Sequence, residues 1–230
     1  MKSNRQLEKS YDLVGKKILQ RNNLNLIDLK NSLNLFTKKS IKKKKPKTIY
    51  LEVYGLLSGL PFSRKTLFSI EKIKKELKKI LKNKLCYWVK PKNLAVEYCV
   101  FKWPKNKWQF KWEKDIISFL ENSNYKSFCL LIKGIQIHED GCIIAKGYEK
   151  GKIQNIRSEI ISKLKFIPKK QSNWAHIPIG RILEPISGSQ FSQLKKMVSK
   201  LSKIKISSEK IDRLNFVHET RWYMEEKKII

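Results

Sequence analysis

A strand–helix–strand pattern occurs twice in this chain, and this repetition limits the possible folds more than any other feature. The first unit spans residues 49–101 and the second spans residues 142–183. The helix of the first unit, residues 63–82, has apolar side chains at steps of three and four residues and lysines on its other face, which is typical of an amphipathic helix. Two such units predict an α+β domain with two lobes of antiparallel sheet, helices packed outside and a central cleft.

The remaining elements follow from the same reasoning. β-branched and aromatic residues predict strands at 49–54, 94–101, 128–137, 142–148, 175–183 and 214–223. Further helices are expected at 114–121, 153–164 and 189–203. Glycine and proline predict a loop at 55–61 and a hairpin turn at 138–141, and Pro178 indicates an edge or bulge position in its strand.

Residues 1–47 are expected to form a basic N-terminal extension or linker. Weak amphipathic helices are predicted at 7–19 and 24–33, and a lysine block follows at 38–47. Such a block repels itself and stays extended, and Pro46 stops any helix. The α+β domain then covers residues 48–230, with one lobe at about 48–125 plus the C-terminal strand and the other at about 126–205.

The net charge of +31 indicates attraction to a polyanion, first nucleic acid and second an anionic membrane surface. Drift of codons in an AT-rich genome explains the same charge equally well. Only seven of the 51 basic residues are arginine, the residue whose forked guanidinium suits phosphate best. The charge alone therefore leaves function and codon bias open.

The composition also excludes some classes of protein. No apolar run approaches the ~20 residues of a membrane span, and residues 1–17 hold no stretch of signal-peptide type, so a cytoplasmic protein without a membrane partner is expected. The four cysteines show no C-x-x-C spacing and are expected to be reduced and mostly buried. The three histidines do not stand at metal-ligand spacing from them, so neither a metal nor a cofactor is expected.

Two short segments carry a resemblance to a known family. Residues 88–94, W-V-K-P-K-N-L, look like the lead-in to the first motif of the two-histidine phosphoesterases, the LigT-like or 2′-5′ RNA ligase family. Residues 174–181, W-A-H-I-P-I-G-R, are similar to the second motif of that family. The resemblance covers about residues 48–223. It implies two lobes that each contribute a strand with His-x-Thr/Ser to one concave site.

The departures from this pattern bear on the chemistry. Ala95 stands where the first motif would place histidine, Glu97 stands at its hydroxyl position, and Pro178 replaces the hydroxyl residue of the second motif, while His176 is kept. The family mechanism implies one imidazole as base and one as acid on a phosphodiester, a task that suits a pKa near neutrality. Alanine cannot move a proton, so we expect that reaction to be lost, unless Glu97 has a raised pKa and acts as the acid.

Other residues are candidates for the same site. His218 and Thr220 form a second His-x-Thr that could supply the missing imidazole and a phosphate-binding hydroxyl; the alternative is a surface histidine beside a good strand former. Arg181 would hold phosphate by the resemblance, or else would form a strand-end ion pair, with Glu184 as one possible partner. His138 is expected to be a polar turn residue.

A nucleic-acid-binding surface is expected from two further groups. One consists of Trp103 and Trp108, which lie among lysines and could stack unpaired bases or simply cover the core. The other group is the lysine block: Lys42, Lys43, Lys44 and Lys45.

Three functions remain open from the sequence. The first is a degenerate LigT-like protein that binds RNA or a nucleotide phosphate in its cleft. The second is an active phosphodiesterase on 2′-5′ or 2′,3′-cyclic phosphate ends, with His176 and either His218 or Glu97 as the acid–base pair. The third is a structural or interaction protein without catalysis. The fold alone does not select among these three functions.

Overall fold

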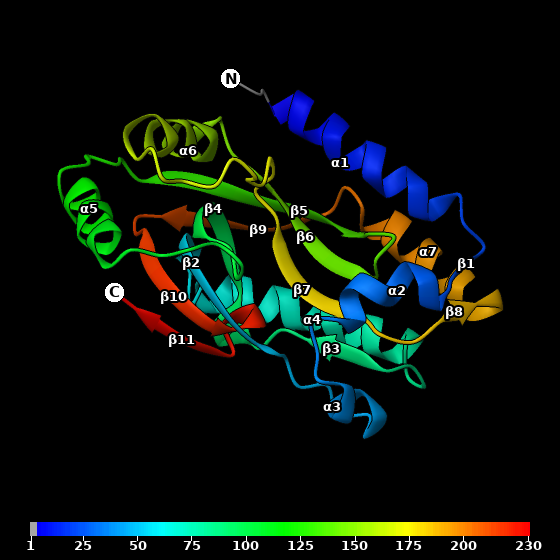
Figure 1. Ribbon diagram of the computed structural model, residues 1–230. Helices are drawn as coiled ribbons and strands as arrows, with labels where there is room; N and C mark the ends of the chain where they lie inside the picture. Colours follow the sequence, from blue (N-terminus) through cyan, green and yellow to red (C-terminus); the bar gives the residue numbers. More distant parts are fainter. Residues whose placement is uncertain (1–3) are drawn as a thin grey trace.

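Two antiparallel sheets form the centre of the computed structural model, which describes residues 4–230 (Figure 1). The small sheet has the order β11-β10-β2-β4, and the large sheet has the order β3-β7-β6-β5-β9. The strands of the small sheet are β2 (Tyr50–Gly59), β4 (Ala95–Lys102), β10 (Asn215–Arg221) and β11 (Glu226–Ile229). Those of the large sheet are β3 (Cys86–Trp88), β5 (Phe128–Ile137), β6 (Cys142–Tyr148), β7 (Ile177–Ile182) and β9 (Lys205–Ile211).

Helices surround these sheets, so the predicted α+β class is confirmed (Figure 1). They are α1 (Asn4–Leu19), α2 (Leu26–Leu33), α3 (Lys38–Lys42), α4 (Arg64–Ile80), α5 (Phe110–Glu121), α6 (Lys152–Lys163) and α7 (Gly188–Leu201). The short strands β1 (Asn23–Leu24) and β8 (Ile186–Ser187) pair with each other, and 3₁₀ turns occur at η1 (Pro91–Asn93) and η2 (Trp222–Met224).

The helices of the two halves are exchanged between the sheets. α4 follows β2 of the small sheet in the chain but packs against β9 of the large sheet, whereas α6 follows β6 of the large sheet and contacts β4 of the small one. β3 likewise belongs to the large sheet although it precedes β4. The two halves are therefore interleaved in the sequence. The lobe expected at about 48–125 plus the C-terminal strand contributes α4 and β3 to the large sheet, and the lobe expected at about 126–205 contributes α6 to the small one.

β4 forms one edge of the small sheet, and side chains cover its free edge. The amide of Gln171 receives the N–H of Val100 at 2.9 Å and donates to its carbonyl at 2.8 Å, while Nε of Arg157 donates to the carbonyl of Tyr98. These contacts satisfy backbone groups that an open edge would offer to another chain. β4 is thereby fixed where it meets β7 of the large sheet.

Much of the segment 4–47 packs against the rest of the domain. Leu7 and Tyr11 of α1 join a buried cluster with three residues of β6, and the Tyr11 hydroxyl donates to the carbonyl of Gly147 at 3.3 Å. The lysine block does not stay extended, because Lys38–Lys42 form α3 and Thr37 and Lys47 pair through their backbones at 2.9 Å. The hydroxyl of Ser40 closes this turn by receiving the N–H of Lys47 at 2.9 Å.

Three strand predictions need correction. β2 continues through Gly59 where a loop was expected, because β10 and β4 pair with it on both sides across Gly55 and Leu57. β9 was missed because its inward positions include Ser207 and Glu209, which hide the alternation of apolar residues. β11 was missed because it is a short, largely exposed edge strand, Glu226–Ile229.

Glu209 of β9 caps the first turn of α4 and ties this helix to the large sheet. Its carboxylate accepts the N–H of Ser63 at 2.8 Å, the hydroxyl of Ser63 at 2.8 Å and the hydroxyl of Thr66 at 2.6 Å. The carboxylate is buried and lies at the positive end of the helix dipole. It therefore satisfies donors that the start of a helix leaves without partners.

We expect Glu209→Ala to lower the free energy of unfolding by about 2–3 kcal/mol, because buried donors lose a charged acceptor. Chemical denaturation monitored by circular dichroism measures this change. Glu121→Ala, on the exposed part of α5, is the matched control and should leave stability within about 0.5 kcal/mol of wild type. Equal losses in the two variants would contradict the capping role.

Candidate functional site

A cavity of ≈ 210 Å³ lies where β4 of the small sheet faces β7 of the large one. It brings together the four positions at which the sequence departs from or keeps the two-histidine pattern: Ala95, Glu97, His176 and Pro178. The turn η2 closes one side with its three residues. The full lining consists of Leu57, Val89, Asn93, Ala95, Glu97, Cys142, His176, Pro178, Arg181, Glu219, Trp222, Tyr223 and Met224.

Strand geometry explains why these positions meet. Ala95 and Glu97 are two residues apart on β4 and therefore share a face. Pro178, two residues after His176, lies in β7, where it cannot donate a hydrogen bond to β6. The pairing of β6 and β7 accommodates it with a shift of register, because Ile143 pairs with Gly180 and Ile144 with Pro178. The bulge predicted at Pro178 is present.

Two carboxyl groups in the cavity, those of Glu97 and Glu219, have raised pKa values. Burial raises the pKa of Glu97 to about 7, although the charge of Arg157 acts in the opposite direction. Burial also raises the pKa of Glu219 to about 8; the N–H of Met224, which donates to it at 2.9 Å, lowers the pKa, and the negative charge of Glu97 raises it further. Near neutral pH these two groups are therefore partly protonated.

His176 has the opposite preference. Burial lowers the pKa of its imidazole to about 4, and the neighbouring His138, Arg181 and Arg157 act in the same direction. The ring stands edge-on to Trp174 with centroids 5.8 Å apart, and its Nδ1 is buried without a hydrogen-bond partner. At pH 7 the cavity thus contains a neutral imidazole beside carboxyl groups that hold a proton.

Arg181 lines the cavity, but its guanidinium is already engaged. Nη1 donates to Asp140 at 2.7 Å and to the hydroxyl of Ser32, and Nε donates to the hydroxyl of Tyr223. Burial acts to raise the pKa of Asp140, but the charge of Arg181 and the N–H of Cys142 outweigh it and hold that pKa below its usual value. The partner of Arg181 is therefore Asp140, and the carboxylate of Glu184 instead accepts the N–H of Leu85 at 2.8 Å.

His218 and Thr220 do not line this cavity. Both lie on β10 on the opposite face from Glu219, because neighbouring residues of a strand alternate. The imidazole of His218 stacks on Tyr54 with centroids 4.2 Å apart, and its Nε2 lies 3.4 Å from Oε1 of Glu52. The hydroxyl of Thr220 donates to the carbonyl of Glu226 at 3.4 Å. The structure thus brings His176 together with Glu97 and separates it from His218.

The aromatic residues of the expected RNA surface pack against their own chain. Trp108 stacks on Tyr54 with centroids 4.1 Å apart, and it meets Trp112 edge-on at 5.7 Å. The indole of Trp103 donates to the carbonyl of Lys170 at 3.0 Å. The four lysines of the block are exposed around α3: Lys42, Lys43, Lys44 and Lys45. They lie on the surface and do not line the cavity.

His138 is more than a polar turn residue. It packs edge-on against Trp174 with centroids 5.3 Å apart, and burial lowers its pKa, with Asp140 acting to raise it and Arg181 to lower it. Cys129 is exposed, while Cys99 and Cys142 are buried as expected. Of these side chains, only Cys142 adds a nucleophile or a proton donor to the cavity. Burial raises the pKa of its thiol to about 11.

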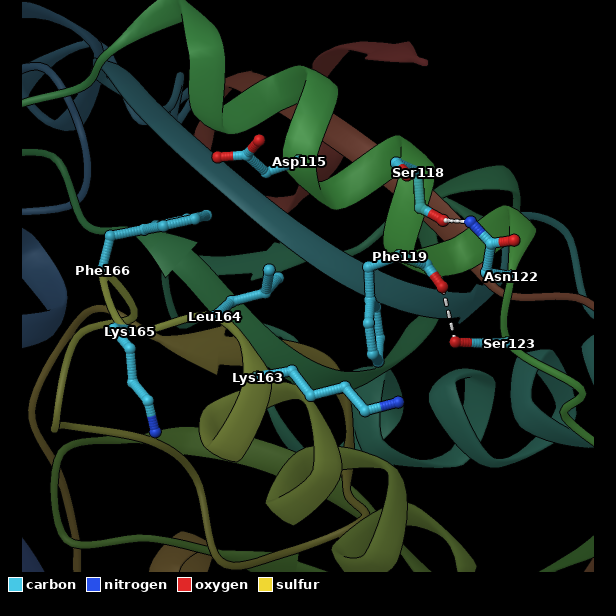
Figure 2. Close-up of a pocket in the computed structure, with 9 residues that line it drawn as sticks. All are labelled: Asp115, Ser118, Phe119, Asn122, Ser123, Lys163, Leu164, Lys165 and Phe166. Atoms are coloured by element: carbon cyan, nitrogen blue, oxygen red, sulfur yellow. Dashed lines mark hydrogen bonds between the residues drawn. The ribbon is translucent and has the colours of Figure 1, made fainter.

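A larger hollow of ≈ 440 Å³ lies between α5 and the end of α6 (Figure 2). Two of its polar side chains bond to backbone carbonyls of α5, since Asn122 donates to the carbonyl of Ser118 at 2.7 Å and Ser123 to that of Phe119 at 2.6 Å. The ammonium of Lys163 lies 5.3 Å from the ring centroid of Phe119. None of the four motif positions lines this hollow, so the smaller cavity is the better candidate.

The sequence reasoning missed Glu219, Trp222, Tyr223 and Asn93 as lining residues. Glu219 stands between His218 and Thr220, so a choice of these two residues selects the other face of the strand. Asn93 was part of the quoted lead-in but was not given a role. The position of Trp222 and Tyr223 directly after the end of a strand was a sequence signal for a role at the site. In the structure, η2 turns the chain here, with a positive φ of 61° at Tyr223.

Comparisons with known proteins leave the family unassigned. No family model matches the chain, and no curated protein matches it. Among solved structures, the crystal structure of TT0787 of Thermus thermophilus is similar over 77% of this chain and 97% of that one, with 11% identity and a TM-score of 0.49. A TM-score of this size carries no functional argument. Within residues 4–230 there is neither a helix able to cross a membrane nor a group of three side chains suited to a metal ion.

The raised pKa of Glu97 makes stability depend on pH in a defined direction. A carboxyl whose pKa is about 7 when folded and near 4 when unfolded stabilises the fold at low pH, and this contribution is lost as the pH rises through 7. As the pH rises from 5 to 8, we expect the free energy of unfolding of Glu97→Gln to increase by about 2 kcal/mol relative to that of wild type. Urea denaturation across this range measures it, with Glu121→Gln as a control whose difference should stay flat. A flat difference for Glu97→Gln would show that its carboxyl titrates normally.

Proposed function

We propose that this protein is a degenerate two-histidine-phosphoesterase-like domain that binds RNA or a nucleotide at this cavity and its basic rim, without the two-histidine reaction. The observation that carries the proposal is the meeting of all four motif positions in one cavity, with a single imidazole among them. The resemblance in the two short segments points to this family, and the arrangement of the positions agrees with it. RNA is favoured over other polyanions by the same resemblance.

The side chains present explain why the two-histidine reaction is not expected. Ala95 has no proton to transfer, and neither Glu97 nor Pro178 offers a hydroxyl to a phosphate oxygen. Arg181 is committed to Asp140 and Tyr223. An ionised carboxylate 4 Å from a phosphate charge would repel it by about 4 kcal/mol at an effective dielectric constant of 20.

Apart from the paired Arg181, the positive charge near the cavity lies beside it. Nζ of Lys227 donates to Oδ1 of Asn93 at 2.8 Å, and burial followed by the charge of nearby Lys92 lowers its pKa. Lys90 adds a third ammonium and pairs with Glu225. We call Lys90, Lys92 and Lys227 the rim lysines. Lysines at such a place bind phosphates as point charges, and they do so independently of base sequence.

The rim lysines provide the first test. We expect full-length protein to bind a fluorescent single-stranded RNA with an affinity that falls steeply with salt, and Lys90→Gln/Lys92→Gln to weaken binding about tenfold and to lower the salt slope by about 1–2. Fluorescence anisotropy from about 50 to 200 mM salt measures both. Lys126→Gln/Lys150→Gln removes the same charge from exposed positions outside the cavity and its rim. Equal losses in the two variants, or no binding at low salt, would exclude the proposed site.

A phosphodiesterase is the second candidate, and one observation favours it. Glu97 with a pKa of about 7 and neutral His176 line the same cavity and could act as acid and base. Under our proposal we expect no turnover of a 2′,3′-cyclic nucleotide between pH 5 and pH 8, assayed by phosphate-ester product formation. Turnover that disappears in both Glu97→Gln and His176→Ala would replace binding with catalysis as the function.

A further inference from the structure

Three residues that line the cavity carry buried nitrogen atoms without hydrogen-bond partners. They are Nδ2 of Asn93, Nε1 of Trp222 and Nδ1 of His176. They come from three separate segments: η1, η2 and the residue before β7. Buried polar groups are nearly always paired, so each unpaired one calls for a partner such as an ordered water, an ion or a ligand, and the grouping of three around one cavity is the basis for the ligand considered below.

The orientation of Asn93 identifies its unpaired atom as a donor. Nζ of Lys227 can only donate, so the atom that it contacts at 2.8 Å is the carbonyl oxygen of the Asn93 amide. The unpaired atom is then the NH₂ nitrogen. The indole nitrogen of Trp222 is also a donor only. Asn93 and Trp222 thus each have one buried N–H group without an acceptor, and both residues belong to the wall of the cavity.

Glu97 offers the complementary acceptors. Its carboxyl group forms no hydrogen bond or salt bridge with another described residue, although it feels the charge of Arg157. A carboxylate accepts two parallel N–H bonds in one plane. One oxygen of Glu219 is used by the N–H of Met224, which leaves the pair of oxygens on Glu97 as the free acceptors of this kind in the cavity.

The walls and the volume restrict the shape of the ligand. Leu57, Val89, Pro178 and Met224 give apolar surface, and the aromatic rings of Trp222 and Tyr223 complete it. A volume of ≈ 210 Å³ is below the range of about 300–1,000 Å³ found for drug-sized ligands. Such a space suits one flat ring system and excludes a whole nucleotide. A phosphate group is also unsuited, since the arginine in the wall is already paired.

We propose that the cavity takes the base of the nucleotide rather than its phosphate, and that this base is of the guanine type. Guanine presents two adjacent N–H donors for the carboxylate of Glu97, and a carbonyl oxygen beside them for Asn93 and Trp222. The sugar and phosphate then lie toward the rim lysines. The inference rests on the function proposed above, because it assigns a ligand to the same cavity. Adenine fits poorly, since it places a ring nitrogen acceptor where the carboxylate needs a donor.

Nucleosides test this inference without the phosphate. In calorimetric titration of full-length protein at pH 8, where Glu97 is ionised, we expect guanosine to bind at least about tenfold more tightly than adenosine. Glu97→Gln should reduce the affinity for guanosine at least about tenfold, because an amide replaces one acceptor with a donor. In ¹H–¹⁵N spectra the indole N–H signal of Trp222, assigned with Trp222→Phe, should shift with guanosine. Glu121→Gln is the control and should keep wild-type affinity.

The outcomes separate the two proposals. Guanosine and adenosine binding equally, or guanosine binding that Glu97→Gln does not weaken, overturns the assignment of the base. If RNA still binds through Lys90 and Lys92 while no nucleoside binds, the base assignment fails and the proposed function stands. If neither RNA nor any nucleoside binds at low salt, both fail. Thermal unfolding of each variant shows whether a loss of affinity comes from a loss of fold.

Discussion

The guanidinium group of Arg181 is the contact on which the shape of the cavity depends. It joins β7 to three segments that are far apart in the sequence: α2 through Ser32, the β5–β6 hairpin through Asp140 and the turn η2 through Tyr223. Removing one partner of this partly buried ion pair leaves the other charge without compensation, so the four segments hold their places together. The wall formed by Tyr223, the position of α2 and the commitment of the arginine all follow from this one group.

Acidic groups line the cavity and lysines surround it, whereas a cleft that binds phosphate would have its basic groups inside. Carboxyl groups, a neutral imidazole and the guanidinium of Arg181, which is paired with Asp140, line the interior, and lysines lie at the rim. Burial keeps the interior groups close to neutral, which allows them to sit among apolar walls. A ligand that enters the interior therefore meets hydrogen-bonding groups of low charge, while the strong positive potential of the chain acts on whatever remains outside.

The sequence predicted those elements in which buried residues recur at a regular spacing. It did not predict elements whose burial depends on a partner far away in the sequence. The apolar spacing of α4 and the alternation of β4 were readable because one face of each is buried in the core. β9 was not readable, since its inward Glu209 has its partners on α4. On β10 the choice between His218 and Glu219 depends on which face meets the other sheet, and alternation alone cannot decide it. The N-terminal extension packs on the domain because Leu7 and Tyr11 contact β6. The composition of the extension does not predict this contact.

The exchange of α4 and α6 between the sheets makes the two halves a single cooperative unit. α4 packs against β9 and also contacts α7, and both of these elements come late in the chain. Contacts across such sequence separations require the closure of long loops before they stabilise anything, which slows folding. During synthesis the apolar face of α4 therefore stays without these contacts until the C-terminal segments are made, while the opposite face of the helix is rich in lysine.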